Sequence, residues 1–187
     1  MYGAIILLGL SSSITIRLLN PAMVPGKTLL RAERVAATIL GQAGVEVTWL
    51  ECDGVGNPCR QDLMPNPFWL HLLKTRPPRL RSDATGFAVL MRQRDGAASY
   101  AGVSYPAVEH VAYDLEAEVS DVLGATMAHE IGHILLGSKT HSRSGVMSSR
   151  LQRQDVRMAS RGELRFTGGE AERIRGELSR RAQRGGR

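Results

Sequence analysis

The first fifty residues alternate between strand-like and helix-like hydrophobic patterns. Residues 13–20 are rich in β-branched side chains and end at an Asn-Pro pair, which predicts a strand. Residues 28–42 carry apolar side chains at helical spacing, with glycines near their end, which predicts a helix. Residues 45–51 alternate between apolar and polar positions, as a second strand does. This β-α-β pattern predicts two parallel strands joined by a right-handed crossover.

Three further segments extend the predicted sheet. Residues 68–74 are apolar enough for a buried strand, and residues 86–93 form another strand candidate after a Pro- and Arg-rich connection. Residues 100–104 and 107–113 flank Pro106, and proline cannot donate a hydrogen bond to a neighbouring strand. This region therefore predicts a sheet edge or a short bent hairpin.

The strongest helix pattern covers residues 119–136, where apolar side chains occupy nearly every face. Such a helix is expected to be buried, and Asp114 offers a helix N-cap ahead of it. A last helix over about residues 168–183, capped by Thr167, has only a thin apolar stripe and should dock on a surface. The expected fold class is α+β with an α/β-like start. A twisted mixed sheet packs on the buried helix, and a smaller C-terminal subdomain ends in a helix.

The chain of 187 residues is long enough to form one sizeable hydrophobic core but too short for two independent ones. We therefore expect a single domain over residues 1–187, with the sheet and the buried helix in 13–136 and a smaller part in 137–187. No apolar stretch reaches the ~20 residues of a membrane span. The apolar run at residues 4–10 is either the end of a secretory signal or a lead-in to the first strand.

The net charge of +6 is concentrated near the C-terminus, because residues 143–187 contain twelve arginines and only five acidic residues. A solvated Arg-rich surface is favoured over a nucleic-acid site, since no aromatic residues are interleaved with the arginines. Nucleic acid is thus not an expected partner, and we expect a monomer.

The only two cysteines, Cys52 and Cys59, flank a turn sequence with two glycines and a proline. Such a turn brings two cysteines within disulfide range, whereas their spacing is wrong for a C-x-x-C redox or zinc pair. A disulfide is the favoured interpretation, and two buried thiols are the alternative. A disulfide favours a secreted or periplasmic location over a cytoplasmic one.

The candidate chemistry lies in the buried helix, which contains the sequence H-E-I-G-H. His129 and His133 are four residues apart and share one helix face, with Glu130 beside them. Two such imidazoles can bind a zinc ion while the carboxylate acts on water. Gly137 offers a left-handed end to the helix, and His141 follows in the next turn. Buried polar groups need partners, and a zinc ion would satisfy these together.

At these residues the chain resembles the metzincin clan of zinc metallopeptidases, whose pattern is H-E-x-x-H-x-x-G-x-x-H followed by a methionine-containing turn. The resemblance implies a twisted sheet above an active-site helix, and a cleft along an antiparallel edge strand. It also implies a role for each matching residue: zinc binding for His129, His133 and His141, general base for Glu130, helix end for Gly137, and Met-turn for Met147.

The spacing after His133 departs from that pattern, because Gly137 comes one residue late and His141 two residues late. Glu163 or Glu170 is the alternative third ligand, as in the scheme where a downstream glutamate completes the site. His141 is preferred because S-G-V-M follows it at the distance of a Met-turn.

The resulting hypothesis is a zinc-dependent metalloendopeptidase that hydrolyses peptide or protein substrates. An extended substrate is expected to pair with an edge strand, for which residues 100–104 are the candidate. A zinc-dependent RNA-processing endonuclease and a non-catalytic zinc-stabilised module are the alternatives.

Overall fold

The computed structural model describes residues 12–53, 59, 68–78, 80, 81, 83–90 and 99–185. The apolar run at residues 4–10, most of the turn between the cysteines and residues 91–93 of the fourth predicted strand lie outside the described residues. The expected β-α-β opening is present. Strand β1 (Ser12–Leu19) leads through helix α1 (Gly26–Gln42) into strand β2 (Val45–Glu51), which pairs with β1 in parallel.

The sheet has five strands in the order β2-β1-β3-β5-β4. Strands β3 (Phe68–Leu73) and β5 (Ser99–Ser104) continue the parallel part, whereas β4 (Gly86–Val89) pairs antiparallel with β5. Together with five helices, this mixed sheet confirms the predicted α+β fold class. Strand β4 forms one edge of the sheet.

The prediction for the region around Pro106 was wrong. Residues 100–104 belong to β5, which lies between β3 and β4 and so has no free edge for a substrate. Residues 107–113 lie in helix α2 (Tyr105–Asp114), where Pro106 occupies the first turn. Proline is well tolerated there, because the first N–H groups of a helix have no partner within the helix.

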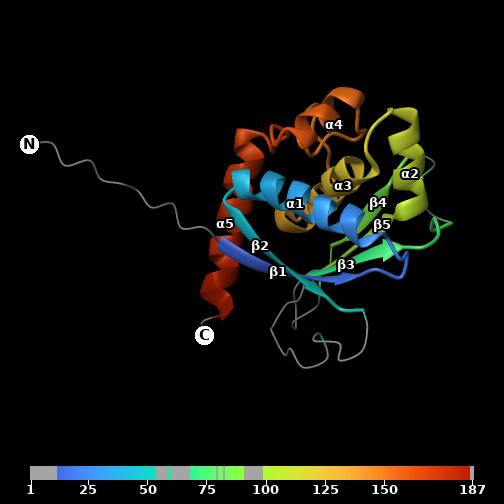
Figure 1. Cartoon of the computed structure of the whole chain (residues 1–187). Helices are drawn as coiled ribbons and strands as arrows, with labels where there is room; N and C mark the ends of the chain where they lie inside the picture. Colours follow the sequence, from blue (N-terminus) through green and yellow to red (C-terminus); the bar gives the residue numbers. More distant parts are fainter. Residues whose placement is uncertain are drawn as a thin grey trace, which may run out of the picture.

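Helix α3 (Val119–Leu136) lies with α1 on one face of the sheet (Figure 1). Asp114 ends α2 and does not cap α3, which begins after Glu118. From Ser120 to Leu135 every residue of α3 except His129 is buried, as its apolar pattern predicted. The helices α1 and α3 cross closely, since a Cβ atom on Gly124 would lie 2.6 Å from the carbonyl oxygen of Ala32.

Two helices follow the turn after α3. Helix α4 (Arg153–Ser160) was not predicted, because only Val156 and Ala159 of this mostly polar segment are buried. Helix α5 (Gly168–Gly185) docks through the thin stripe expected for it, formed by Ala171, Ile174 and Leu178.

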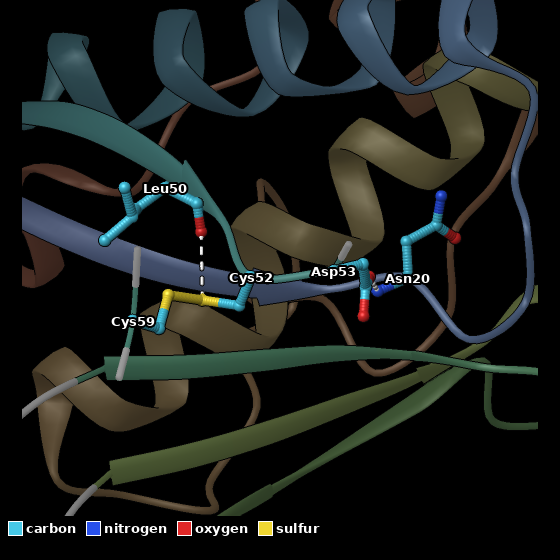
Figure 2. Close-up of a disulfide and its surroundings, with 5 residues drawn as sticks. All are labelled: Asn20, Leu50, Cys52, Asp53 and Cys59. Carbon is cyan, nitrogen blue, oxygen red and sulfur yellow. Dashed lines mark hydrogen bonds between the residues drawn. A yellow bond between two sulfur atoms is a disulfide. The ribbon is translucent and has the colours of Figure 1, made fainter. Parts of the chain in front are cut away.

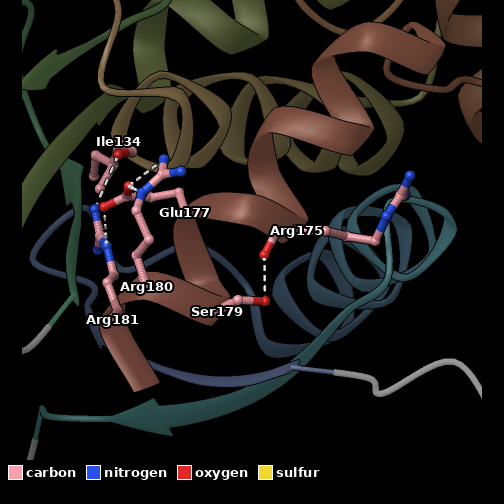
Figure 3. Close-up of polar contacts among 6 residues, drawn as sticks. All are labelled: Ile134, Arg175, Glu177, Ser179, Arg180 and Arg181. Atoms are coloured by element: carbon pink, nitrogen blue, oxygen red, sulfur yellow. Dashed lines mark hydrogen bonds and ion pairs between the residues drawn. The ribbon is translucent and has the colours of Figure 1, made fainter. Parts of the chain in front are cut away.

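Polar contacts hold α5 against the rest of the molecule, some of them shown in Figure 3. Arg181 donates to the carboxylate of Glu177 at 3.0 Å and to the carbonyl oxygen of Ile134, at the end of α3, at 3.4 Å. Arg175 donates to the carbonyl oxygen of Ala43 at 3.3 Å. The C-terminal helix therefore supports the end of the buried helix α3.

Cys52 and Cys59 form a disulfide just beyond β2, with their Cα atoms 5.5 Å apart (Figure 2). The Cys52 sulfur lies 3.3 Å from the carbonyl oxygen of Leu50. The next residue, Asp53, accepts a hydrogen bond from the backbone N–H of Asn20. No helix among the described residues is long and apolar enough to cross a membrane.

Candidate metal centre

Three histidines converge at the C-terminal half of α3. His129 and His133 lie one helical turn apart, and their Nε2 atoms are 3.0 Å from each other. His141 comes from the loop after the helix, with its ring centroid 5.3 Å from that of His129 and 5.0 Å from that of His133. One ligand atom from each residue lies within 4.8 Å of the other two. The structure thus brings together the three histidines expected to bind a metal.

Hydrogen bonds on the far side of two rings set which nitrogen faces the centre. Nδ1 of His129 lies 2.7 Å from the carbonyl oxygen of Val146, and Nδ1 of His133 lies 2.7 Å from that of Ser138. A carbonyl oxygen only accepts, so each Nδ1 carries the hydrogen and each Nε2 of the neutral ring is left with a lone pair. Such second contacts are typical of metal-binding histidines.

Two bare Nε2 atoms 3.0 Å apart repel each other unless a cation or a proton lies between them. Two nitrogens bound to one tetrahedral zinc are ~3.3 Å apart, from bond lengths of ~2.0–2.1 Å. Burial lowers the pKa of His129 to about 4, and burial also lowers the pKa of His133. Both rings are therefore neutral at pH 7, and the donor set fits a zinc ion better than a shared proton.

Glu130 is buried beside the triad, with 4% of its surface exposed. Its Oε2 atom has no hydrogen-bond partner among the described residues, and burial raises the pKa of the side chain to about 8. On its other side lies Gly86, the first residue of the edge strand β4. A Cβ atom there would come 2.7 Å from Oε1 of Glu130. A cation bound by the histidines would favour the ionised carboxylate and lower this pKa.

The two glutamates considered as alternative ligands lie in different environments. Glu163 is exposed, whereas Glu170 is buried at the start of α5. Glu170 accepts a hydrogen bond from the hydroxyl group of Ser142 through Oε1, and from the N–H of Thr167 at 2.8 Å through Oε2. Both of its oxygens are thus engaged, and it anchors the residue that follows His141.

The end of α3 and the loop behind the triad are also well defined. Gly137 has φ +60°, and the N–H of Ser138 donates to the carbonyl oxygen of His133 at 3.2 Å. Left-handed backbone of this kind favours glycine. The extra residues in the spacing are thus accommodated by a helix end that still returns His141 to the other two rings.

Met147 is fully buried beneath the helix, directly against Gly132. A Cβ atom on Gly132 would lie 2.6 Å from the Met147 sulfur and 2.8 Å from the ring of Phe166. Neither Gly132 nor Gly86 was expected at the site, although a glycine inside a strong helix pattern, such as Gly132, signals a close approach. Ser142 gave no such signal, since its partner Glu170 is 28 residues away.

No protein-family model matches the sequence, and no curated protein sequence is significantly similar to it. Solved structures do match. Archaemetzincin from Methanopyrus kandleri superposes with a TM-score of 0.53 over 92% of this chain and 99% of its own, at 18% sequence identity. Metalloproteinase-II from Bacteroides fragilis matches with a TM-score of 0.54 and 11% identity, over 89% of this chain and 53% of its own length. The chain has the fold of these proteins.

Proposed function

We propose that this protein is a zinc-dependent metalloendopeptidase. The observation that carries the proposal is the convergence of three imidazoles beside one buried carboxylate. The Nδ1 atoms of His129 and His133 donate to carbonyl oxygens, which leaves their Nε2 atoms free to bind a metal. The fold shared with archaemetzincin and with a bacterial metalloproteinase supports it.

His129, His133 and His141 would hold the zinc ion. Once bound, zinc supplies a Lewis acid that polarises a carbonyl group and lets water act as a nucleophile near neutral pH. Met147 would serve as the Met-turn residue, packing under the helix as a soft apolar floor and not as a ligand.

Glu130 would move the proton during hydrolysis. Its carboxylate accepts a proton from the attacking water as the oxygen forms its bond to the scissile carbonyl carbon. The same proton then passes to the amide nitrogen, which leaves as an amine when the C–N bond breaks. The carboxylate is buried against Gly86 of the edge strand, and Glu130 follows His129 directly in the chain, so both transfers would take place beside the proposed zinc ligands.

Strand β4 would bind the substrate. It pairs with β5 on one side only among the described strands, so its other edge can accept an extended peptide through main-chain hydrogen bonds. Gly86 begins this strand and contacts Glu130, which brings the bound peptide close to the proposed base. The free edge of β4 therefore replaces residues 100–104 as the strand proposed to bind the substrate.

Other parts of the proposal concern the whole protein. The disulfide is compatible with a secreted or periplasmic enzyme, since such bonds persist in oxidising compartments. A monomer with a single catalytic domain over residues 1–187, divided near residue 136, stays a prediction.

Metal analysis joined to a cleavage assay tests the proposed function. Purified protein should bind about one zinc ion per chain and cleave a reduced, unstructured protein. A chelator should abolish cleavage, and added zinc should restore it. Equal cleavage by the metal-free protein would contradict a zinc peptidase, and zinc binding without any cleavage would favour the non-catalytic module.

A further inference from the structure

The charged side chains in the loop that carries His141 are all cationic. Residues 137–154 contain one lysine and three arginines and no acidic residue. Arg153 pairs with Glu116 at 3.0 Å. Lys139, Arg143 and Arg150 are exposed and have no ion-pair partner among the described residues. We call these three side chains the cationic rim.

Chain geometry keeps two members of the rim beside the third histidine. Lys139 and Arg143 are each two residues from His141. The residue before Lys139 is Ser138, whose carbonyl oxygen lies 2.7 Å from Nδ1 of His133. The residue before Arg143 is Ser142, which is held by Glu170.

Arg150 lies further along the same loop. Ser142 and Ser148 form a parallel bridge, and the hydroxyl group of Ser148 donates to the carbonyl oxygen of Arg150 at 3.1 Å. The charge of Arg150 also acts on Asp83, which lies three residues before β4, although no ion pair joins the two side chains. Two hydrogen bonds from Arg81 are the main reason that the pKa of Asp83 is lowered, and the charge of Arg150 adds to the effect.

Two arginines of α5, unlike the three rim residues, form ion pairs within the described part of the chain (Figure 3). Arg180 bonds Glu177 at 2.8 Å, and Arg181 bonds Glu177 and the carbonyl oxygen of Ile134. Both guanidinium groups are therefore already bonded to groups of this chain. The three rim charges are exposed and make no ion pair among the described residues. Lys139 and Arg143 lie two residues from His141, and Arg150 lies nine residues from it.

We propose that the cationic rim makes the protein select acidic peptides, with Asp or Glu close to the scissile bond. This inference rests on the proposed peptidase function. Unpaired charges of one sign beside a site attract ligands of the opposite sign and raise their rate of association. The effect acts over about a Debye length, ~8 Å at physiological salt, so side chains near the scissile bond feel it most.

A peptide fits this rim better than a nucleic acid does. The free edge of β4 offers main-chain hydrogen bonds to an extended polypeptide. Residues 137–154 contain no Phe, Tyr or Trp on which bases would stack. Single-stranded RNA is therefore kept as an outcome of the test.

The test uses two fluorogenic peptides that differ only in Glu or Lys at the positions flanking the scissile bond. At low salt, the zinc-loaded protein should show a kcat/KM about tenfold higher for the Glu peptide, and high salt should remove most of the difference. The rim variant combines Lys139→Glu, Arg143→Glu and Arg150→Glu, and should abolish or reverse the preference. A matched control, Lys27→Glu with Arg161→Glu and Arg173→Glu, changes the net charge equally at exposed positions outside residues 137–154 and should keep the preference.

A binding assay separates failure of this inference from failure of the proposed function. Fluorescence anisotropy of both labelled peptides, with the zinc-loaded Glu130→Gln protein, reports charge selection without cleavage. Tighter binding of the Glu peptide, lost in the rim variant, supports the inference even if no peptide is cleaved. Equal binding of the two peptides, equal loss in the control variant, or tighter binding of a labelled single-stranded RNA would overturn it.

Discussion

The carboxylate of Glu170 accepts a hydrogen bond from the hydroxyl group of Ser142, the residue directly after His141. Glu170 also caps the start of α5 through Thr167, whose N–H and hydroxyl group both contact it. The C-terminal helix therefore reaches the candidate metal centre through one buried side chain. Glu170 does not need to be a ligand to influence the metal, because it positions the loop that carries one.

This relationship predicts that Glu170→Gln and Ser142→Ala weaken zinc binding. Losing a partner that orients a ligand lowers metal affinity by about 10–100-fold. Competition with a chromophoric chelator measures the affinity, and circular dichroism checks that the fold is kept. Glu172→Gln, at an exposed position of the same helix turn, is the matched control and should leave the affinity unchanged. Equal affinities for all four proteins would contradict a positioning role.

The identity of the third ligand is tested by a second pair of variants. His141→Ala should lose zinc affinity far more strongly than Glu170→Gln, because it removes a donor and not its support. Glu163→Gln should bind zinc as the unaltered protein does, since Glu163 is exposed. The absorption spectrum of the cobalt-substituted protein reports the coordination directly. A cobalt spectrum unchanged in His141→Ala would rule out this histidine as a ligand.

Local patterns were enough to predict most of the scaffold and the three histidines that the structure brings together. The β-α-β opening and the buried helix α3 follow from hydrophobic periodicity, which depends on neighbouring residues alone. The segment around Pro106 was misread because proline is accommodated both at sheet edges and in the first turn of a helix. The sequence gives both the same signal.

Other features depend on contacts between distant residues. The S-G-V-M sequence favoured His141 over Glu170 as the third ligand, but the contacts of Glu170 depend on where α5 docks. Ser142 and Glu170 are 28 residues apart, and nothing local marks them as partners. Helix α4 was missed because its few buried residues, Val156 and Ala159, carry too weak a periodic signal.

The close approach of Met147 to Gly132 predicts an unusual effect of alanine. Alanine normally stabilises a helix interior relative to glycine by roughly 0.5–1 kcal/mol. At Gly132 the new Cβ would lie 2.6 Å from the Met147 sulfur, and overpacking of this kind costs about 1–3 kcal/mol. Gly176→Ala in α5 is the control, because a Cβ there meets only Arg180, at 3.7 Å. Urea unfolding should rank Gly176→Ala above, and Gly132→Ala below, the unaltered protein, and the reverse order would contradict the packing.

Glu33, on α1, predicts a dependence of stability on pH. Burial, with a contribution from the charge of Glu51, raises the pKa of Glu33 to about 7. Folding therefore favours its protonated form, so its contribution to stability is full below pH ~4.5 and is lost as the pH rises through about 7. Glu33→Gln avoids this loss and should be more stable than the unaltered protein at pH 8, by up to about 3 kcal/mol, with little difference at pH 4. Unfolding of the metal-free proteins at both pH values measures it, and an advantage equal at both would contradict the assignment.

The proposed role of Glu130 as the base of a zinc-dependent peptidase can be tested in a single comparison. The zinc content and the rate of peptide cleavage are determined together for the unaltered protein and for Glu130→Ala. The variant should keep its zinc, because the three histidines are intact, and its kcat should fall by about 10²–10⁴-fold. A zinc-loaded Glu130→Ala protein that cleaves peptides at the unaltered rate would contradict it.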